Sequence, residues 1–366
     1  MLEVDLSEPL DGFSLEAKIA TQCAGITVVF GDSGSGKTAL LTLLAGLRRP
    51  AGGRIVVAGE VVFDSAAGID LPPQRRRFGC LFPEDRLFPH LTVRGNLCFG
   101  QRRAPAAERR ADLERVAGLL GLAELLDRRP AALGPGARQR VALGRALLAG
   151  PRLLLMDEPL AALDPGEAEE LLACLERLRD ELALPMVYAT TALPQALRLA
   201  DNLAILAAGQ IAAAGPPEQV MARLDLPVLA ARPDAGAVIA ATVAGQDKMF
   251  GLTELRFAGG RLRVPHLDLP LGRSLRLHIA ARDVAVAYTP PENTSILNII
   301  PCVIEAIGEE KSPQVELRLE AGGAILRARV TARSRAALGL RPGLPVYALV
   351  KAVSLAGAAR IGVSGK

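Results

Sequence analysis

Residues 31–38 read Gly31-Asp-Ser-Gly-Ser-Gly-Lys-Thr38, and this stretch decides the fold. It follows the apolar run 26–30, which predicts a buried strand, and it precedes the helical pattern of residues 38–45. A glycine-rich turn in that position offers backbone N–H groups and the positive end of a helix dipole to an anion. The lysine adds a charge for β- and γ-phosphate oxygens, and the threonine hydroxyl suits Mg²⁺. We therefore predict a nucleoside triphosphate site for ATP, formed by Gly31, Asp32, Ser33, Gly34, Ser35, Gly36, Lys37 and Thr38.

An acidic pair follows a second apolar run. Residues 153–156 carry Asp157 and Glu158 to the carboxyl edge of the predicted sheet, where ligands bind in open α/β folds. We expect Asp157 to hold Mg²⁺ together with Thr38, and Glu158 to act as the catalytic base toward water. A third apolar run at 185–189 completes an alternation of strands and helices. The pattern predicts an α/β P-loop NTPase core with a parallel sheet.

The bulk composition excludes several other classes of protein. The formal net charge of +4 arises from 43 basic and 39 acidic side chains, an excess too small to predict nucleic-acid binding. We interpret the short basic run 72–77, with Arg75, Arg76 and Arg77, as a solvated loop. The five cysteines are scattered without metal-ligand spacing. No apolar run reaches the roughly 18 residues that a membrane-spanning helix needs.

The character of the sequence changes near residue 230. Beyond it, short strand-like runs recur at intervals of roughly ten residues, which predicts an all-β barrel or sandwich. We therefore assign residues 1–230 to the nucleotide-binding domain, with a helical subdomain at about 88–150. Residues 231–291 form a β-rich connecting segment, and residues 292–362 form the C-terminal barrel domain.

Three motifs in the first 225 residues resemble the ATPase subunit of an ABC transporter. Residues 157–164 are similar to its Walker B motif and D-loop, 139–147 to the helix after its signature loop, and 87–97 to the segment that faces the membrane subunits. The resemblance implies a homodimer that binds each ATP between residues 31–38 of one subunit and 133–136 of the other. It also implies these further ATP contacts: Gly134, Gly136, Asp164 and Thr191.

The C-terminal part resembles that of molybdate-importer ATPases, on residues 294–298, 328–331 and 346–352. The resemblance implies an OB-like, Mop-type barrel that holds molybdate through Ser295 and Lys351. A purely structural or regulatory barrel stays an alternative, because Leu297 stands where many such motifs carry arginine. Tungstate and sulfate stay open as substrates.

The same resemblance implies a set of partners and a location. The chain would work at the cytoplasmic face of the cell membrane as a peripheral subunit. It would contact a membrane permease through residues near 83–99, and a periplasmic or extracellular binding protein indirectly through that permease.

Four positions depart from the family pattern. Pro83 replaces the Q-loop glutamine, Gly134-Pro135 replaces Ser-Gly in the signature loop, and Thr191 stands near the position of the switch histidine. Two interpretations follow. Either neighbours such as Glu84, Arg138 and Thr191 compensate and the protein is a competent ATPase, or it is a degenerate, weakly hydrolysing regulatory or heterodimer subunit.

Overall fold

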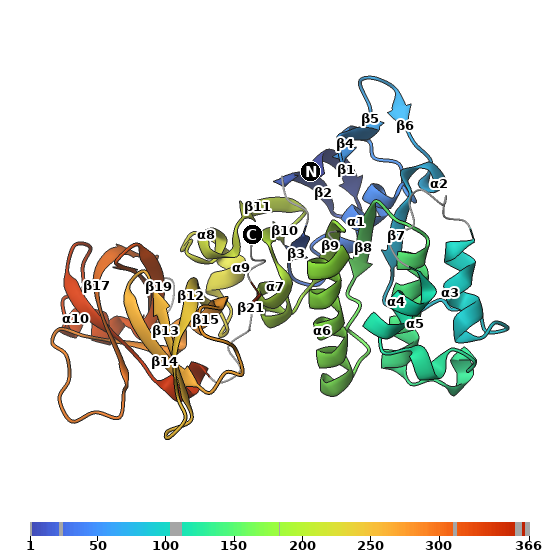
Figure 1. Cartoon of the computed structure of the whole chain (residues 1–366). Coiled ribbons are helices and arrows are strands. Elements are labelled where there is room, and N and C mark those ends of the chain that lie inside the picture. The colour runs from blue at the N-terminus through green and yellow to red at the C-terminus, as the bar shows by residue number, and fades with distance from the viewer. Residues whose placement is uncertain are drawn as a thin grey trace. The chain divides into compact units, whose positions relative to one another are not determined.

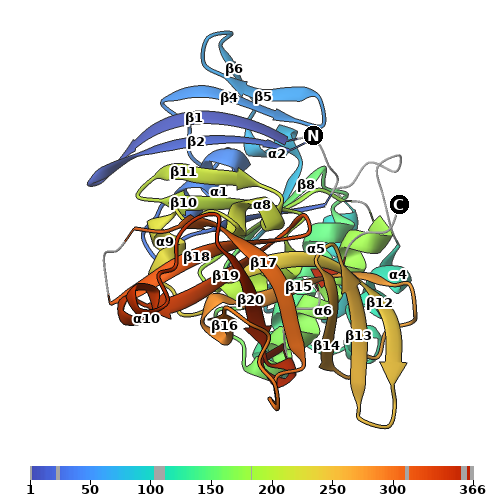
Figure 2. The same cartoon turned by 90° about the vertical axis from the view of Figure 1, so that its left-hand side faces the viewer.

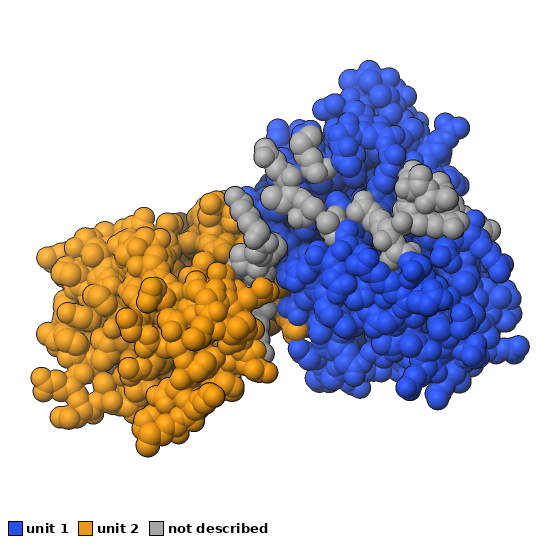
Figure 3. Space-filling model, in the orientation of Figure 1, with its two compact units in different colours: residues 1–192, 199–215 blue, residues 193–198, 216–366 orange. Residues whose placement is uncertain are grey.

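The computed structural model describes residues 2–21, 25–102, 112–182, 184–309, 313–355 and 361–362 (Figure 1). The chain divides into two compact units, which Figure 3 colours separately. The first unit comprises residues 1–192 and 199–215, and the second comprises 193–198 and 216–366. The boundary that the sequence placed near residue 230 lies inside the second unit, because two short helices that follow residue 215 belong to it.

The first unit is built on one eleven-stranded sheet with the order β6-β5-β4-β1-β2-β11-β10-β3-β9-β8-β7. Its strands are β1 (Leu2–Leu10), β2 (Phe13–Thr21), β3 (Ile26–Phe30), β4 (Gly52–Val57), β5 (Glu60–Asp64), β6 (Ile69–Asp70), β7 (Phe78–Leu81), β8 (Leu153–Asp157), β9 (Met186–Thr190), β10 (Asn202–Ala207) and β11 (Gln210–Gly215). The strands from β10 through β3, β9 and β8 to β7 pair in parallel, whereas β1, β2, β4, β5 and β6 pair antiparallel. Every residue of β3, β8 and β9 is buried, because a parallel sheet is covered on both faces. The predicted α/β core is confirmed.

Helices connect these strands. They are α1 (Lys37–Ala45), α2 (Pro73–Arg76), α3 (Val93–Gln101), α4 (Leu113–Leu119), α5 (Pro135–Leu148), α6 (Pro165–Leu182) and α7 (Leu193–Leu199). Helices α3, α4 and α5 lie between β7 and β8, within the range 88–150 assigned to a helical subdomain, and α5 packs against both others. None of the helices in the described ranges is long and apolar enough to span a membrane.

Two five-stranded sheets with a common core form most of the second unit (Figure 2). Their orders are β14-β13-β12-β15-β21 and β16-β20-β17-β18-β19. The strands are β12 (Gly236–Asp247), β13 (Leu252–Phe257), β14 (Gly260–Pro265), β15 (Ser274–Ala280), β16 (Val284–Ala287), β17 (Asn298–Ile307), β18 (Gln314–Ala321), β19 (Ala324–Thr331), β20 (Pro345–Val350) and β21 (Ile361–Gly362), and the helices are α8 (Pro217–Met221), α9 (Pro227–Ala230) and α10 (Ala332–Ala337). Side chains such as Leu255, Leu277 and Leu317 from both sheets pack into one cluster. The connecting segment and the predicted barrel thus share a core, and the predicted all-β architecture is confirmed.

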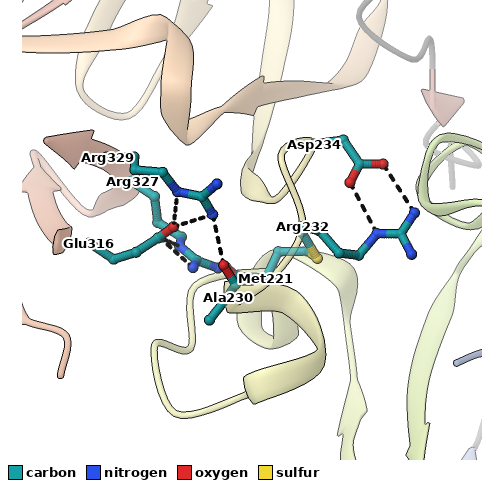
Figure 4. Close-up of polar contacts among 7 residues, drawn as sticks. All are labelled: Met221, Ala230, Arg232, Asp234, Glu316, Arg327 and Arg329. Carbon is teal, nitrogen blue, oxygen red and sulfur yellow. Dashed lines mark hydrogen bonds and ion pairs between the residues drawn. The ribbon is translucent and has the colours of Figure 1, made fainter. Parts of the chain in front are cut away.

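A buried ionic cluster fastens the β18–β19 hairpin to the two short helices of the same unit (Figure 4). Arg327, only 1% exposed, donates to Glu316 Oε2 at 3.0 Å and to the carbonyl oxygen of Met221, at the end of α8, at 3.0 Å. Arg329 donates to Glu316 Oε1 at 2.6 Å and to the carbonyl oxygen of Ala230, at the end of α9, at 3.1 Å. Both guanidinium groups therefore satisfy helix carbonyls that have no partner within their own helix.

The expectation that the run 72–77 is a solvated loop is wrong for its central arginine. Arg76 is 1% exposed, and its Nη1 donates to the carbonyl oxygens of Leu43 at 2.9 Å and Leu44 at 2.7 Å. These are the last carbonyls of α1, the negative end of a helix dipole, which a cation stabilises. Burial lowers the pKa of Arg76 from its ordinary value, and the hydrogen bond and charge of Asp70 act in the opposite direction.

Replacing Arg76 should therefore destabilise the first unit. Arg76→Ala removes the donor to the Leu44 carbonyl and one of the two donors to the Leu43 carbonyl, and we expect the free energy of unfolding to fall by about 3 kcal/mol. Arg75→Ala, one position away and exposed, is the matched control and should change it by less than about 0.5 kcal/mol. Urea unfolding of the full chain measures both values. Equal effects of the two substitutions would contradict the assigned role.

Candidate functional site

The glycine-rich loop between β3 and α1 has the backbone geometry that its sequence predicted. Gly34 and Gly36 adopt φ angles of 79° and 107°, a region that glycine enters without strain. A Cβ atom on Gly31 would lie 2.2 Å from the carbonyl oxygen of Leu206 in β10, so only glycine fits there. The loop therefore turns sharply into the N-terminus of α1, with Gly36 as the N-cap residue.

Lys37 is folded into this loop. Its side chain is 6% exposed, and Nζ donates to the carbonyl oxygens of Gly31 at 2.9 Å and Asp32 at 3.0 Å. The same ammonium group lies 3.6 Å from Oε1 of Glu158, which follows β8. The two motifs predicted to share one site are thus joined by a direct ionic contact.

Strand register explains why these groups meet. Phe30 pairs with Thr190, and Asp157 pairs with Ala189, so β3, β9 and β8 end side by side. The Glu158 amide donates to the Ala189 carbonyl oxygen at 3.1 Å, and the Gly31 amide donates to that of Thr190 at 3.4 Å. The carboxyl ends of three neighbouring parallel strands therefore place the loop, the acidic pair and the 190–191 turn at one edge.

Two buried polar atoms at this edge have no hydrogen-bond partner within the described residues. They are Oδ1 of Asp157, a residue that is 3% exposed, and Oγ of Ser35 in the loop. Buried polar atoms are normally satisfied, so each such exception calls for a ligand or a solvent molecule. A carboxylate oxygen without a partner, near a phosphate-type loop, fits a hard cation with oxygen ligands.

The signature loop, residues 133–136, leads into α5. Gly134 is the N-cap residue and Pro135 occupies the first helical position, where the missing N–H costs nothing because that group has no helical partner. The Gly136 amide donates to Oε1 of Glu167 at 2.9 Å. The Glu167 amide in turn donates to Oδ1 of Asp164 at 2.8 Å, which links the signature loop to the D-loop within one subunit.

Sequence reasoning missed Glu167. A signal was present, because Asp164 and Glu167 have the spacing of a helix capping box at the start of α6. This spacing predicts only hydrogen bonds between Asp164 and Glu167 at the start of α6. It does not predict that the Glu167 side chain instead reaches the amide of Gly136, which lies far away in the sequence.

The remaining predicted positions lie near strand ends. Pro83 and Glu84 are exposed in the turn after β7, and Thr191 is half-buried directly after β9. The neighbouring Thr190 is completely buried, and its Oγ1 accepts a hydrogen bond from the Ala192 amide at 3.1 Å. The 190–191 turn is therefore held against the sheet edge by its own hydrogen bonds.

In the second unit, Ser295 and Lys351, the two residues predicted to bind an oxyanion, lie at the same end of the paired strands β17 and β20. Asn298 pairs with Val350 in antiparallel register, so Ser295 before β17 and Lys351 after β20 emerge at one edge. Both residues are exposed, and Leu297 between them in the motif is 45% exposed. The arrangement leaves the lysine and serine accessible to an anion.

Comparison with known proteins gives a consistent result for both units. A family model described as ABC transporter matches residues 16–161, and a TOBE domain model matches residues 294–356. A molybdenum import ATP-binding protein, ModC, from Rhodospirillum rubrum is 50% identical over 361 residues, with 97% of each chain covered. The ModC protein of Mesorhizobium japonicum is 48% identical and covers 96% of this chain and 95% of its own length.

Solved structures resemble the nucleotide-binding part. The cbiO1 protein from Clostridium perfringens, described as part of an ABC transporter complex, has a TM-score of 0.53 and 26% identity, and covers 61% of this chain and 90% of its own. An ATP-binding subunit of an ABC transporter has a TM-score of 0.51 and 28% identity, and covers 60% and 91%. Proteins named ModC are up to 50% identical in sequence to this chain over nearly its whole length. The protein therefore belongs to the ModC family of ABC-transporter ATP-binding proteins.

Proposed function

We propose that this protein binds and hydrolyses ATP to energise import of molybdate, or a related oxyanion, through a membrane permease. The observation that carries the enzymatic part is the ionic contact of 3.6 Å between Lys37 of the phosphate loop and Glu158 after β8. It brings a phosphate-binding cation and a candidate base to one edge of the sheet. The substrate rests on the molybdenum import proteins that match 97% of the chain. Their names support an active ATPase and not the degenerate alternative.

The loop would hold the triphosphate through its backbone. The amides of residues 31–36 would bind phosphate oxygens at the positive end of α1, and Lys37 would place its charge on the β- and γ-phosphates. Mg²⁺ would be held by the Thr38 hydroxyl and by Asp157, whose buried Oδ1 has no partner among the described residues. The ion would neutralise charge that develops on the transferred phosphoryl group.

Glu158 would act as the general base that accepts a proton from attacking water. Its carboxylate lies 3.6 Å from the buried ammonium of Lys37 and neutralises its charge. Phosphate oxygens are the stronger partners for that ammonium, so binding of the triphosphate would release Glu158 toward water. Binding of the triphosphate to the loop would thus free the Glu158 carboxylate to accept a proton, because both compete for Lys37.

The active form would be a dimer in which each ATP contacts both subunits. Gly134 and Gly136 of one signature loop would face the ATP bound to the loop of the other, with Asp164 joining the two sites and Thr191 near the γ-phosphate. The Glu167 carboxylate that accepts from the Gly136 amide would have to leave as the γ-phosphate arrives, because both groups are anionic. Pro83 supplies neither a side-chain oxygen nor an N–H, so water and Mg²⁺ would depend on Glu158 and Asp157.

The C-terminal region, residues 292–362, would bind oxyanion through Ser295 and Lys351. The permease would contact the first unit near residues 83–99, at the cytoplasmic face of the membrane, and a periplasmic or extracellular binding protein would deliver the oxyanion to that permease. The exposed pair at the shared end of β17 and β20 supports oxyanion binding. Molybdate is the favoured ligand, and tungstate and sulfate are its competitors.

Removing the base should separate hydrolysis from binding. Glu158→Gln keeps the size of the side chain but cannot accept the proton, so ATP turnover should fall by roughly 10²–10⁴ while nucleotide affinity is retained. Turnover and equilibrium binding of ATP with Mg²⁺ measure the two effects. Glu114→Gln, on the exposed surface of α4, is the control and should leave turnover unchanged. Wild-type turnover no higher than that of Glu158→Gln would exclude the proposed enzyme.

The oxyanion proposal is tested by titrating the full chain with molybdate, tungstate and sulfate in a calorimeter. Lys351→Gln removes a charge-assisted hydrogen bond worth about 1.5–3 kcal/mol, so molybdate affinity should fall by about tenfold or more. Lys248→Gln, an exposed lysine at the β12–β13 turn, should not change it. Absence of binding by the wild type, or equal loss in both variants, would leave the barrel with a structural role.

A further inference from the structure

Helix α5, which begins at the signature loop, holds the segment of residues 82–88 through side-chain contacts. Gln139 Nε2 donates to the carbonyl oxygen of Phe82 at 3.2 Å. Arg145 Nη2 donates to the carbonyl oxygen of Asp85 at 3.4 Å, and its guanidinium lies 5.0 Å from the centre of the Phe88 ring. The 82–88 segment follows β7 and includes Pro83, the position from which the usual glutamine is missing.

Arg138 extends this contact to the signature loop itself. Its Nε donates to Oδ2 of Asp85 at 2.8 Å, and its Nη1 donates to the carbonyl oxygen of Leu133 at 2.9 Å. One planar guanidinium thus bridges the 82–88 segment and the first residue of the signature loop. The side chains of Arg138 and Asp85 are 35% and 29% exposed, so the pair is partly shielded from water. Because the donors of arginine are fixed in one plane, a shift of Asp85 must move Leu133 or break a bond.

A second ion pair in the same segment has a different character. Arg86 Nη2 lies 3.0 Å from Oε2 of Glu84, and these side chains are 61% and 70% exposed. Arg86 stacks on the ring of Phe82, within the segment. Glu84, Arg86 and Phe82 all lie within residues 82–88, so this pair does not connect the segment to the signature loop. Its removal therefore provides a chemically matched control for the bridge in an exchange experiment.

We infer that Asp85 and Arg138 are positioning residues that make the signature loop and the 82–88 segment move as one piece. Three observations support this role: the bridge is partly shielded from water, Arg138 bonds a partner on each side, and it lies at the start of α5. The inference rests on the proposed function, because it gives the permease-facing part of the chain a route to the loop that would contact ATP across the dimer.

The first experiment needs no permease. Amide hydrogen exchange of the full chain, with and without ATP and Mg²⁺, follows peptides covering residues 82–88 and 133–137. In the wild type and in Glu84→Gln, both segments should change protection together. Asp85→Asn keeps the backbone carbonyl that accepts from Arg145. In this variant, nucleotide should change the exchange protection of one segment independently of the other. A joint response that persists in Asp85→Asn would overturn the inference, whatever the transport function proves to be.

The second experiment uses the subunit assembled with its membrane permease in lipid vesicles. Asp85→Asn and Arg138→Gln should each lower permease-stimulated ATP turnover by about tenfold, with the KM for ATP changed by less than about twofold. The double variant should be no worse than either single variant, and Asp85→Glu should restore part of the stimulation. Glu114→Gln, on the exposed surface of α4 and outside residues 83–99, should behave as the wild type.

The possible results distinguish a failure of the positioning role of the bridge from a failure of the proposed transport function. If Asp85→Asn matches Glu114→Gln in stimulated turnover, or if KM rises in step with the loss of turnover, the bridge has no positioning role. If the wild type shows no stimulation by permease, the proposed transport function fails. The exchange experiment then still decides whether the bridge couples the two segments. Additive losses in the double variant would show that the two side chains act separately and would also overturn the inference.

Discussion

The buried ammonium of Lys37 is the constraint on which the candidate site depends. A lysine that is 6% exposed cannot stay charged without close acceptors, and the loop carbonyls of Gly31 and Asp32 meet that need together with Glu158. Those acceptors fix the curvature of the loop, and Glu158 can reach the lysine only because β3, β9 and β8 end in register. Sheet register and loop shape together thus bring three acceptors to one buried ammonium group and compensate its charge.

The sequence predicted the parts of the structure that follow from local patterns. The runs at 26–30 and 153–156 are continuously apolar because their strands are covered on both faces, and both strands formed where expected. The phosphate loop was predictable because Gly34 and Gly36 occupy positive φ angles that other residues avoid, and because a side chain at Gly31 would collide with the carbonyl oxygen of Leu206. Recurrent short strands indicated an all-β C-terminal part, although the pattern did not indicate that the strands near 236–280 and 298–350 share one core.

The features that were not predicted are polar contacts between distant segments. Arg76 looked like one residue of an exposed basic run, yet it caps α1 through the carbonyls of Leu43 and Leu44. Glu167 and the Gly136 amide are likewise brought together only by the packing of α5 and α6. Periodicity reports which face of an element is buried, but it does not report which helix end lies opposite a given side chain. The roles proposed for Gly134 and Asp164 concern a partner subunit, the role proposed for Thr191 concerns the γ-phosphate, and all three remain predictions.

Arginine has a structural use in this chain that explains why net charge is a poor guide to its function. The last carbonyl groups of a helix have no hydrogen-bond donor within the helix. This sequence has no tryptophan and only three tyrosines, so its aromatic residues supply few side-chain donors for such carbonyls. Arginine presents several donors in one plane and tolerates burial when each is bonded. Arg76 caps α1 and Arg327 caps α8, one in each unit, and both are almost fully buried. Basic residues used in this way add positive charge to the composition without adding it to the surface. Arg76 and Arg327 also pair with the carboxylates of Asp70 and Glu316, so counting basic residues in the sequence does not measure the positive charge that the surface presents.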